Sequence, residues 1–460
     1  MMNHKLAKLE RLVINSSDEL DCACIIWIVY FAFIAIFAII YHTVGYSDFR
    51  YCEKFLAGLV LFCNFCYMFY AGKGNKLFRY LAIALLLRFG VAILTAYNIG
   101  NVNAIQRDTN GFHLYAAWGA EKGKFISVYG GMYTPLITII YMLVGPMRLV
   151  STMSNCLFAI TVFLFMAALL KRIHVSKRNI DIAIMIGAFC PSFIWTSGSL
   201  LREMMMQASI IGSLLLFERW FRYNKILPFM SALIVTLPAI NMHCGTIGFV
   251  AAYFIVFFLY SPLKRSIKSG KSLAIKLLMA IVVAVLLITI LFQTKSFHYF
   301  SNKFDNIADS EIELAVTRQA EGGSAYLTFL EGHNNIFLLI FMMPIIYFYF
   351  LFSPMPWNWR GLTDLAMFFG DSIVYIFLLI YIIKHIKHLP KVRKQFVYCV
   401  LLAVGILFFI FSAGTHNAGT AVRHRGKGLP SLLICFALCL PDKRGSKTTT
   451  KIDDKSNEIG

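Results

Sequence analysis

Apolar and polar positions alternate along this chain in long blocks. Uncharged apolar runs recur, and short segments rich in Lys and Arg separate them. A run of about 20 apolar residues, wound as a helix that rises about 1.5 Å per residue, crosses a hydrocarbon core about 30 Å thick. The pattern therefore predicts an all-α polytopic membrane protein.

The apolar runs predict about 12 transmembrane helices. The first run is too long for the apolar region of a signal peptide and lacks a small-residue cleavage site, so we interpret it as a span. The spans are expected at residues 22–44, 55–71, 80–98, 149–170, 180–198, 200–217, 226–240, 246–261, 273–292, 364–383, 395–412 and 429–441. A further apolar run at 336–352 is interpreted as a re-entrant or outer-surface helix, because counting it as a span would invert every later segment.

Charge determines the predicted orientation. If residues 336–352 are not counted as a span, most of the 43 Lys and Arg fall in segments on one side of the membrane, such as 171–179 and 384–394. The positive-inside rule assigns that side to the cytoplasm. Both termini are then cytoplasmic, residues 1–441 form one multi-helix membrane domain, and residues 442–460 form a cytoplasmic tail that is expected to be disordered.

Composition excludes a soluble domain and gives no reason to expect nucleic acid. Hydrophobic residues make up 59% of the chain and charged residues 14%, with a mean hydropathy of +0.69. A soluble fold cannot bury so much apolar surface. The net charge of +20 is accounted for by basic cytoplasmic loops, so no nucleic-acid partner is expected. The 11 Cys lie mostly in apolar runs, which indicates neither a disulfide framework nor a zinc site.

Two predicted outer segments, 99–148 and 293–360, are large enough to carry chemistry and juxtamembrane helices. The first contains Asp108, which follows a basic residue near the outer membrane face. A carboxylate in that place can accept a proton from a hydroxyl. Alternatively, Asp108 caps a helix that begins near Asn110, since Asp and Asn are favoured at helix N-termini.

A second polar cluster joins two predicted spans through a tight outer turn and contains Arg202 and Glu203. Each ion costs on the order of 3 kcal/mol at the centre of a bilayer and less near its surface. Such residues therefore tend to face a cavity. The alternative is a local ion pair that pins the hairpin.

The third and densest cluster spans residues 413–430, where small residues repeat and cations then gather. Glycines let a backbone approach a ligand closely, and Arg423 and Arg425 can grip phosphate oxygens with two hydrogen bonds each. The alternative, a plain basic loop, belongs on the cytoplasmic side, whereas the predicted topology places this cluster outside.

Within the predicted spans, Arg88 and Asp371 form either an intramembrane salt bridge or separate cavity-lining groups.

These strings resemble polytopic glycosyltransferases of the GT-C superfamily. The resemblance rests on the pattern D-x-x-x-(Y/F)-H-x-x-A at residues 108–116, followed by Tyr-Thr-Pro-Leu at 133–136. The chain is similar to the protein O-mannosyltransferases and their bacterial lipid-sugar relatives. Near their C-termini such proteins often carry an R-Y-x-x-P-like string, and residues 423–430 look like a stretched version of it. Residues 197–203, with the string Ser-Gly-x-x-x-Arg-Glu, also resemble bacterial polysaccharide polymerases of the Wzy type.

The resemblance implies a bacterial plasma-membrane enzyme whose donor sugar is carried on a polyprenyl phosphate or diphosphate and is presented from the outer leaflet. The acceptor would be a glycan, a lipid or a protein. Asp108 would be the catalytic base, and cations would stabilise the departing phosphate. The expected substrate-binding residues are His113, Arg202, Glu203, His416, Asn417, Arg423 and Arg425.

No nucleotide or redox cofactor is expected, because the energy resides in the sugar–phosphate bond. Many relatives carry two adjacent acidic residues in the first outer loop, whereas Asp108 is followed by Thr109, so a requirement for a divalent cation stays open.

Two other classes remain as alternatives. A lipid-linked oligosaccharide flippase or another transporter also needs many helices and buried arginines, and Arg88 favours it. A transporter lines the membrane midplane with polar residues, whereas this sequence places them at the outer ends of helices. A structural scaffold would not need clustered outer charges. His243, His385 and His388 are interpreted as ordinary solvated histidines.

Overall fold

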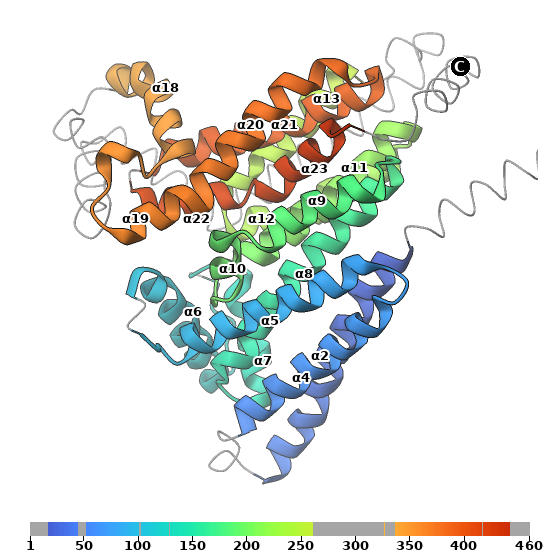
Figure 1. Ribbon diagram of the computed structural model, residues 1–460. Helices are drawn as coiled ribbons and strands as arrows, with labels where there is room; N and C mark the ends of the chain where they lie inside the picture. The colour runs from blue at the N-terminus through green and yellow to red at the C-terminus, as the bar shows by residue number, and fades with distance from the viewer. Residues whose placement is uncertain are drawn as a thin grey trace, which may run out of the picture.

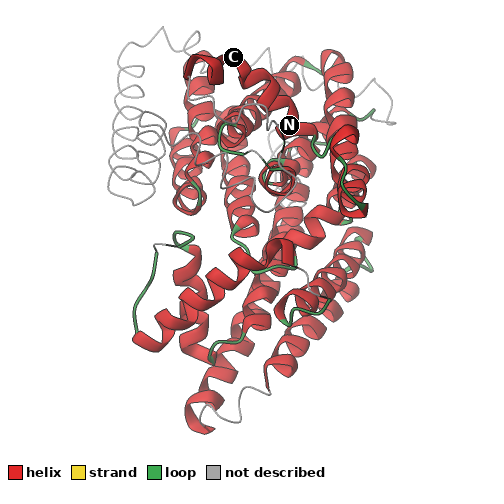
Figure 2. Cartoon of the chain, turned by 90° about the vertical axis from the view of Figure 1, so that its left-hand side faces the viewer, coloured by secondary structure: helices red, strands yellow, loops and turns green. Residues whose placement is uncertain are grey.

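The structure is a computed structural model that describes residues 17–44, 52–100, 103–127, 129–260, 326, 336–415 and 417–441. Within these residues the chain is all-helical and contains no strand (Figure 2). The predicted span 273–292, His416 and the tail 442–460 lie outside the described residues.

The helices of the first half are α2 (Ser17–Val44), α4 (Glu53–Ala71), α5 (Lys76–Ala96), α6 (Asn103–Lys122), α7 (Tyr133–Val144), α8 (Arg148–Arg172), α9 (Lys177–Ala188), α10 (Pro191–Ser197), α11 (Glu203–Tyr223), α12 (Ile226–Met242) and α13 (Ile247–Tyr260). The later helices are α18 (Ile336–Phe352), α19 (Leu362–Met367), α20 (Ile373–His385), α21 (Lys391–Ser412), α22 (Ala418–Gly426) and α23 (Leu429–Cys439). A π-helical turn, Phe368–Ser372, joins α19 to α20.

The described helices are compatible with an integral membrane protein. Six segments are long and apolar enough to cross a membrane, namely Asp18–Thr43, Glu53–Ala71, Lys76–Ala96, Arg148–Arg172, Leu362–His388 and Lys391–Ala413. The bent pair α9 and α10 raises the number to 7 if it is one span, and five more apolar helices are shorter. The predicted all-helical class is confirmed, whereas the predicted number of about 12 spans is not.

Helix α8 forms the centre of the bundle, between the N-terminal helices α2, α4 and α5 and the helices α9 to α11 (Figure 1). Of its most apolar stretch, 89% is buried inside the protein. The hydroxyls of Thr152, Ser154 and Thr161 donate to carbonyls of the same helix, so these polar residues can be buried without loss of hydrogen bonds. Small residues such as these three, where helices contact one another, also let the helix backbones approach closely.

The expected span 180–198 is bent rather than straight. Its two parts, α9 and α10, meet at 65°, with Pro191 at the start of the second. Proline lacks an N–H and therefore fits the first turn of a new helix. Nη1 of Arg88 donates 2.9 Å hydrogen bonds to the carbonyls of Ala84 and Ala188, the latter at the end of α9. Arg88 and Asp371 do not form a mutual salt bridge, because Asp371 pairs with Arg425.

In the described part of the chain, several basic turns that the sequence assigned to one side of the membrane lie together. Lys171, at the end of α8, forms an ion pair with Glu19 near the start of α2. Arg393 donates to the carbonyl of His174 at 3.0 Å, and Arg222 to that of Arg172 at 2.6 Å. These contacts gather around the C-terminal end of α8, a helix of 25 residues that is about 37 Å long. They therefore define one end of the bundle.

The opposite end of α8 contacts α6. Arg148, at the start of α8, donates to the side chains of Asn110 and Thr109 at 2.8 and 2.9 Å. Glu203 likewise begins α11, whose last turn carries Arg222 at the basic end. The polar clusters around Asp108 and Glu203 therefore lie at the end of the bundle away from the basic turns, as the sequence predicted for outer segments.

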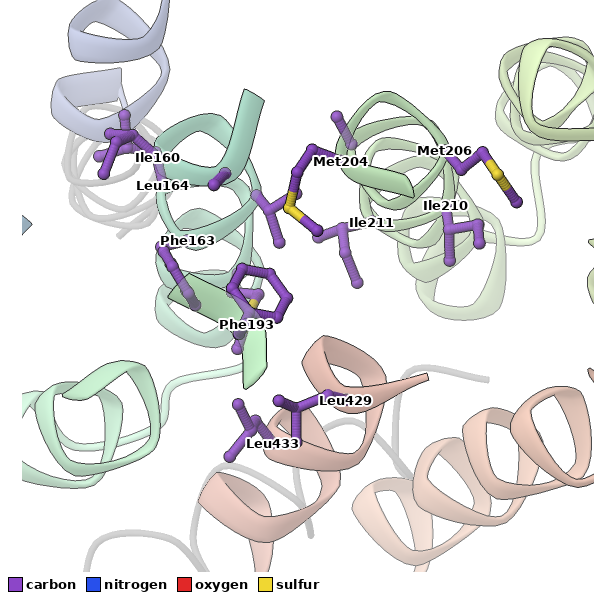
Figure 3. Packing of buried hydrophobic residues seen from close by; sticks show 14 of the residues in the cluster. Ile160, Phe163, Leu164, Phe193, Met204, Met206, Ile210, Ile211, Leu429 and Leu433 are labelled. Carbon is purple, nitrogen blue, oxygen red and sulfur yellow. The ribbon is translucent and has the colours of Figure 1, made fainter. Parts of the chain in front are cut away.

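An apolar core fills the space where α8, α10, α11 and α23 meet. Figure 3 shows its members from these four helices, namely Ile160, Phe163, Leu164, Phe193, Met204, Ile211, Leu429 and Leu433, whereas Met206 and Ile210 point to the other side of α11. All are nearly or completely buried. This packing fixes the starts of α11 and α23 relative to each other, and the candidate site lies at the same level of the bundle.

Candidate functional site

Asp108 lies inside α6, and its carboxylate is bound from two other segments. Its Oδ1 accepts a 3.1 Å hydrogen bond from the hydroxyl of Tyr129, which precedes α7. Its Oδ2 is bound by Nη1 of Arg423 on α22. The side chain remains 41% exposed. The alternative that Asp108 caps a helix beginning near Asn110 is wrong, because α6 begins at Asn103.

A glycine turn holds Tyr129 against α6. Gly130 has a φ of +83°, a conformation that residues with a Cβ rarely adopt. A Cβ added at Gly111 would lie 2.5 Å from the Tyr129 ring, so this ring packs directly on the α6 backbone. The backbone N–H of Met132, further along the turn, donates a 2.7 Å hydrogen bond to Oδ1 of Asn241 in α12. The turn therefore joins α6, α7 and α12.

Glu203 begins α11, and a buried amide on α8 determines its place. Nδ2 of Asn155 donates to the carbonyls of Ser199 and Leu201 at 2.6 and 2.7 Å, which fixes the turn before the helix. A carboxylate is favourable in the first turn of a helix because the backbone N–H groups there lack partners. The side chain is only 1% exposed, and Oε1 accepts a 2.5 Å hydrogen bond from Nε of Arg423. Oε2 is buried without a hydrogen-bond partner among the described residues.

Arg423 thus bridges two carboxylates that belong to different parts of the chain. Its Nη1 binds Asp108 and its Nε binds Glu203. The side chain is 19% exposed. In Figure 1, α22 belongs to the C-terminal group of helices and α6 to the N-terminal part, and both lie on the left of the view. One guanidinium therefore links the two parts of the protein at the end of the bundle away from the basic turns.

Local sequence explains why Arg423 is on a helix. The side chain of Asn417 accepts hydrogen bonds from the backbone N–H groups of Gly419 and Thr420 at 2.8 and 3.3 Å, which is the N-cap arrangement that starts α22. The glycines of this string do not prevent a helix, because residues Ala418–Gly426 are helical.

Two more cations lie beside the bridge. Arg202, the residue before α11, donates from Nη1 to the carbonyl of Met242 at 2.5 Å. Nζ of Lys427 lies 4.0 Å from Oε1 of Glu203. Three cations, including Arg423, therefore surround two carboxylates, which leaves the described cluster with an excess of positive charge.

Two imidazoles complete the cluster. The rings of His243 and His424 lie edge to face with centroids 5.4 Å apart, and both contact the ring of Phe411. Nδ1 of His424 lies 3.0 Å from the hydroxyl oxygen of Thr415. The interpretation of His243 as an ordinary solvated histidine is wrong, because it packs among these groups and is only partly exposed.

The electrostatic state of Asp108 follows from these neighbours. Burial by itself raises the pKa of a carboxyl, but the charge and hydrogen bond of Arg423, with smaller contributions from Tyr129 and Arg202, hold the pKa of Asp108 below its ordinary value. Burial and the nearby carboxylate raise the pKa of Tyr129 to about 12. At neutral pH, Asp108 is therefore an ionised carboxylate and Tyr129 a hydroxyl donor.

Some predicted site residues lie elsewhere. His113 contacts Tyr141 of α7, with 2.7 Å between Nδ1 and the hydroxyl oxygen, and burial lowers its pKa to about 4. Arg425 points away from the cluster and pairs with Asp371 inside the protein. Asn417 caps α22, and His416 lies outside the described residues. The structure thus brings Asp108, Arg202, Glu203 and Arg423 together and places His113, Asn417 and Arg425 outside this cluster.

Several members of the cluster were missed in the sequence. They are Tyr129, Asn241, His243, His424 and Lys427. The two glycines after Tyr129 signal a turn, but no periodic pattern connects that turn to Asp108. The other residues stand at helix ends, and only the packing of α12 and α22 shows that these ends meet.

Within the described part of the chain, no three His, Cys, Asp or Glu side chains are grouped so that they could hold a metal ion. Both carboxylates of the cluster are bound by Arg423. The site is therefore a cation-rich cluster with two paired carboxylates, built at one end of an all-helical protein with several helices suited to a membrane.

Comparison of the chain with protein-family models, with curated proteins and with solved structures gave no match in any of the three.

Proposed function

We propose that this protein is a membrane glycosyltransferase or polysaccharide polymerase that uses sugars linked to polyprenyl phosphate or diphosphate for the assembly of cell-surface glycans. The observation that carries the proposal is the convergence of Asp108, Glu203 and Arg423 from three distant segments at the end of the bundle away from the basic turns. An acid–base group beside an excess of cations suits the transfer of a sugar away from a phosphate.

In the proposed reaction, the carboxylate of Asp108 takes the proton of an acceptor hydroxyl. The acceptor oxygen forms a bond to the anomeric carbon of the donor sugar, and the bond between that carbon and the phosphate oxygen breaks. The electron pair of the broken bond remains on the phosphate, where Arg423, Arg202 and Lys427 stabilise the added negative charge. A guanidinium suits this role because its N–H groups match two phosphate oxygens at once.

The proposal places the cluster at the outer face of a bacterial plasma membrane, with both termini in the cytoplasm and about 12 spans in a GT-C-like arrangement. The concentration of basic residues in turns at the other end of the bundle supports this orientation. It is tested by single cysteines in a background without native thiols. A cysteine at Lys122 should react with an impermeant maleimide added outside cells, and one at Lys225 should not; the reverse result would overturn the orientation.

The function is tested in a deletion strain that carries variant genes. Asp108→Asn retains shape and hydrogen bonding but loses the proton acceptor, and a general base contributes about 10²- to 10⁴-fold in rate. We expect normal amounts of inserted protein, loss of the surface glycan and accumulation of lipid-linked sugar. Glu121→Gln is the matched control, because Glu121 is an exposed carboxylate on the same helix. Normal glycan with Asp108→Asn would contradict the role of this residue as the base.

A lipid-linked oligosaccharide flippase or another transporter is the second candidate, and Arg88 is the residue that favoured it. In the structure, Arg88 is completely buried, binds the carbonyls of Ala84 and Ala188, and lies over the rings of Phe163 and Phe193 at 5.5 and 5.7 Å. These contacts give Arg88 a role in the bent pair α9 and α10. Transport of lipid-linked sugar without any transfer in reconstituted vesicles would favour this second function.

A further inference from the structure

Arg423 uses different atoms for its two carboxylates, and this division has a functional consequence. Nε faces Glu203, whose carboxylate is 1% exposed, at 2.5 Å. Nη1 faces Asp108, whose side chain is 41% exposed. The contact with Glu203 is therefore sheltered, whereas the contact with Asp108 is open to an incoming group. An anion can replace Asp108 at Nη1 while Nε stays on Glu203.

Asp108 is held independently of Arg423. The Tyr129 hydroxyl donates to Oδ1, the oxygen that Arg423 does not bind. Tyr129 is in turn fixed by packing on Gly111. If Nη1 turns to another acceptor, Asp108 therefore keeps its position and loses only its counter-ion.

We propose that Arg423 is a switch: it neutralises Asp108 while the site is empty, and an incoming phosphate group takes over Nη1 and thereby releases Asp108 to act as a base. This inference rests on the proposed function and adds an order of events to it, because the base becomes active only when the donor phosphate is bound. Water that enters an empty site then meets a carboxylate that is paired with a guanidinium and is a weak base.

The charges around Asp108 determine the direction of the change. The groups that hold its pKa down are Arg423 on α22, Arg202 before α11 and the hydroxyl of Tyr129, and burial acts in the opposite direction. Arg148 binds the neighbouring residues Thr109 and Asn110. Loss of an opposite charge at contact distance raises the pKa of a carboxyl by about 1 to 3 units. Asp108 without Arg423 should therefore hold its proton at a higher pH.

The experiment measures the titration of Asp108 in the purified full-length protein. A hydrophobic carbodiimide modifies protonated carboxyls, and mass spectrometry quantifies the modification of Asp108 between about pH 2 and 8, a range that extends below the ordinary pKa of an Asp carboxyl. The probes are farnesyl phosphate, inorganic phosphate and farnesol. We expect farnesyl phosphate to raise the midpoint of Asp108 labelling by about 1 to 3 units and farnesol to leave it unchanged. The exposed carboxyl of Glu121 on α6 is the internal control.

Variants test the switch without any ligand. Arg423→Gln should raise the labelling midpoint of Asp108 to the value seen with farnesyl phosphate, and farnesyl phosphate should then have no further effect. Arg148→Gln is the matched control, because it removes a guanidinium that is bound to α6 but not to Asp108. The titration of the native protein stands by itself if Arg423→Gln fails to fold.

The outcomes separate the switch from the proposed function. Farnesyl phosphate that binds, by calorimetry, without moving the Asp108 midpoint would overturn the switch and leave the function standing. Farnesyl phosphate that fails to bind would overturn both. A shift with inorganic phosphate alone would support the switch and show that the site recognises the phosphate group without the lipid chain.

Discussion

Arg423 and Arg425 lie two residues apart on α22 and have opposite surroundings. Arg423 is 19% exposed and is shared between two carboxylates. Arg425 is 0% exposed, and all three of its guanidinium nitrogens have protein partners. Two residues on a helix differ by roughly 200° around its axis. Two arginines in one basic string therefore face different environments, and only one of them faces the candidate site.

The contacts of Arg425 hold neighbouring segments of the protein together. Nε and Nη2 bind Asp371 at 2.7 and 2.5 Å, and Nη1 donates to the carbonyls of Phe350 and Leu351 at 3.2 and 3.0 Å. Nη2 also donates to the hydroxyl of Ser372. The side chain thus joins α22 to the end of α18 and to the π-helical turn. We propose a phosphate role for Arg423 and not for Arg425, since Arg425 has no nitrogen left for a ligand.

The largest expected effect is loss of folded protein in Arg425→Ala. Removal of one partner leaves Asp371 buried and uncompensated, which costs about 3 to 5 kcal/mol. We expect little inserted protein and a large fall in thermal stability in detergent. Arg423→Ala should retain nearly normal yield, because its partners Asp108 and Glu203 keep other cations nearby. Equal yields of the two alanine variants would contradict the inference that Arg425 stabilises the fold and Arg423 does not.

Replacement of the whole buried pair sharpens the same contrast. Buried ion pairs can often be replaced by apolar residues of similar volume at little cost in stability. The double variant Arg425→Met/Asp371→Leu should therefore recover much of the stability lost in Arg425→Ala. It should also restore the surface glycan in the deletion strain. A stable double variant without glycan would show that Arg425 acts in the reaction after all.

Arg423→Lys should separate charge from geometry at the site. Lysine retains the positive charge but cannot bind Asp108 and Glu203 through two fixed N–H groups. We expect normal yield and a fall in sugar transfer of about 10- to 100-fold, in line with the loss of one or two charge-assisted hydrogen bonds. The measurement is the rate of conversion of lipid-linked sugar in membranes. A larger fall in yield than in transfer per molecule would contradict this expectation.

The smallest effect is expected for Tyr129→Phe. This change removes only the hydrogen bond to Oδ1 of Asp108 and leaves the ring on α6. One hydrogen bond contributes about 0.5 to 1.5 kcal/mol, so transfer should fall about two- to tenfold. The labelling midpoint of Asp108 should rise slightly, because a donor to the ionised carboxylate is lost. Tyr129→Leu should be worse, since it also removes the aromatic packing against Phe112.

The sequence by itself determined the helical class, the apolar character of the segments and the gathering of basic turns at one end of the described bundle. These properties are local, because hydrophobic length and charge can be read from adjacent residues. The same pattern located Asp108, Glu203 and Arg423 in polar clusters beside apolar runs. The predicted number of about 12 spans is not confirmed in the described part of the chain, where α9 and α10 are bent and helices such as α23 are short and buried.

Only the tertiary structure decided which polar residues meet. Asp108 and Arg423 are 315 residues apart, and Glu203 and Arg423 are 220 apart, so no spacing rule connects them. The structure also decided that Arg425 turns inward to Asp371, that His113 packs on Tyr141, and that Arg88 binds a carbonyl at a helix break. Each of these choices depends on the rotation of one helix against another, which is set by side-chain packing across the bundle and leaves no mark in the local sequence.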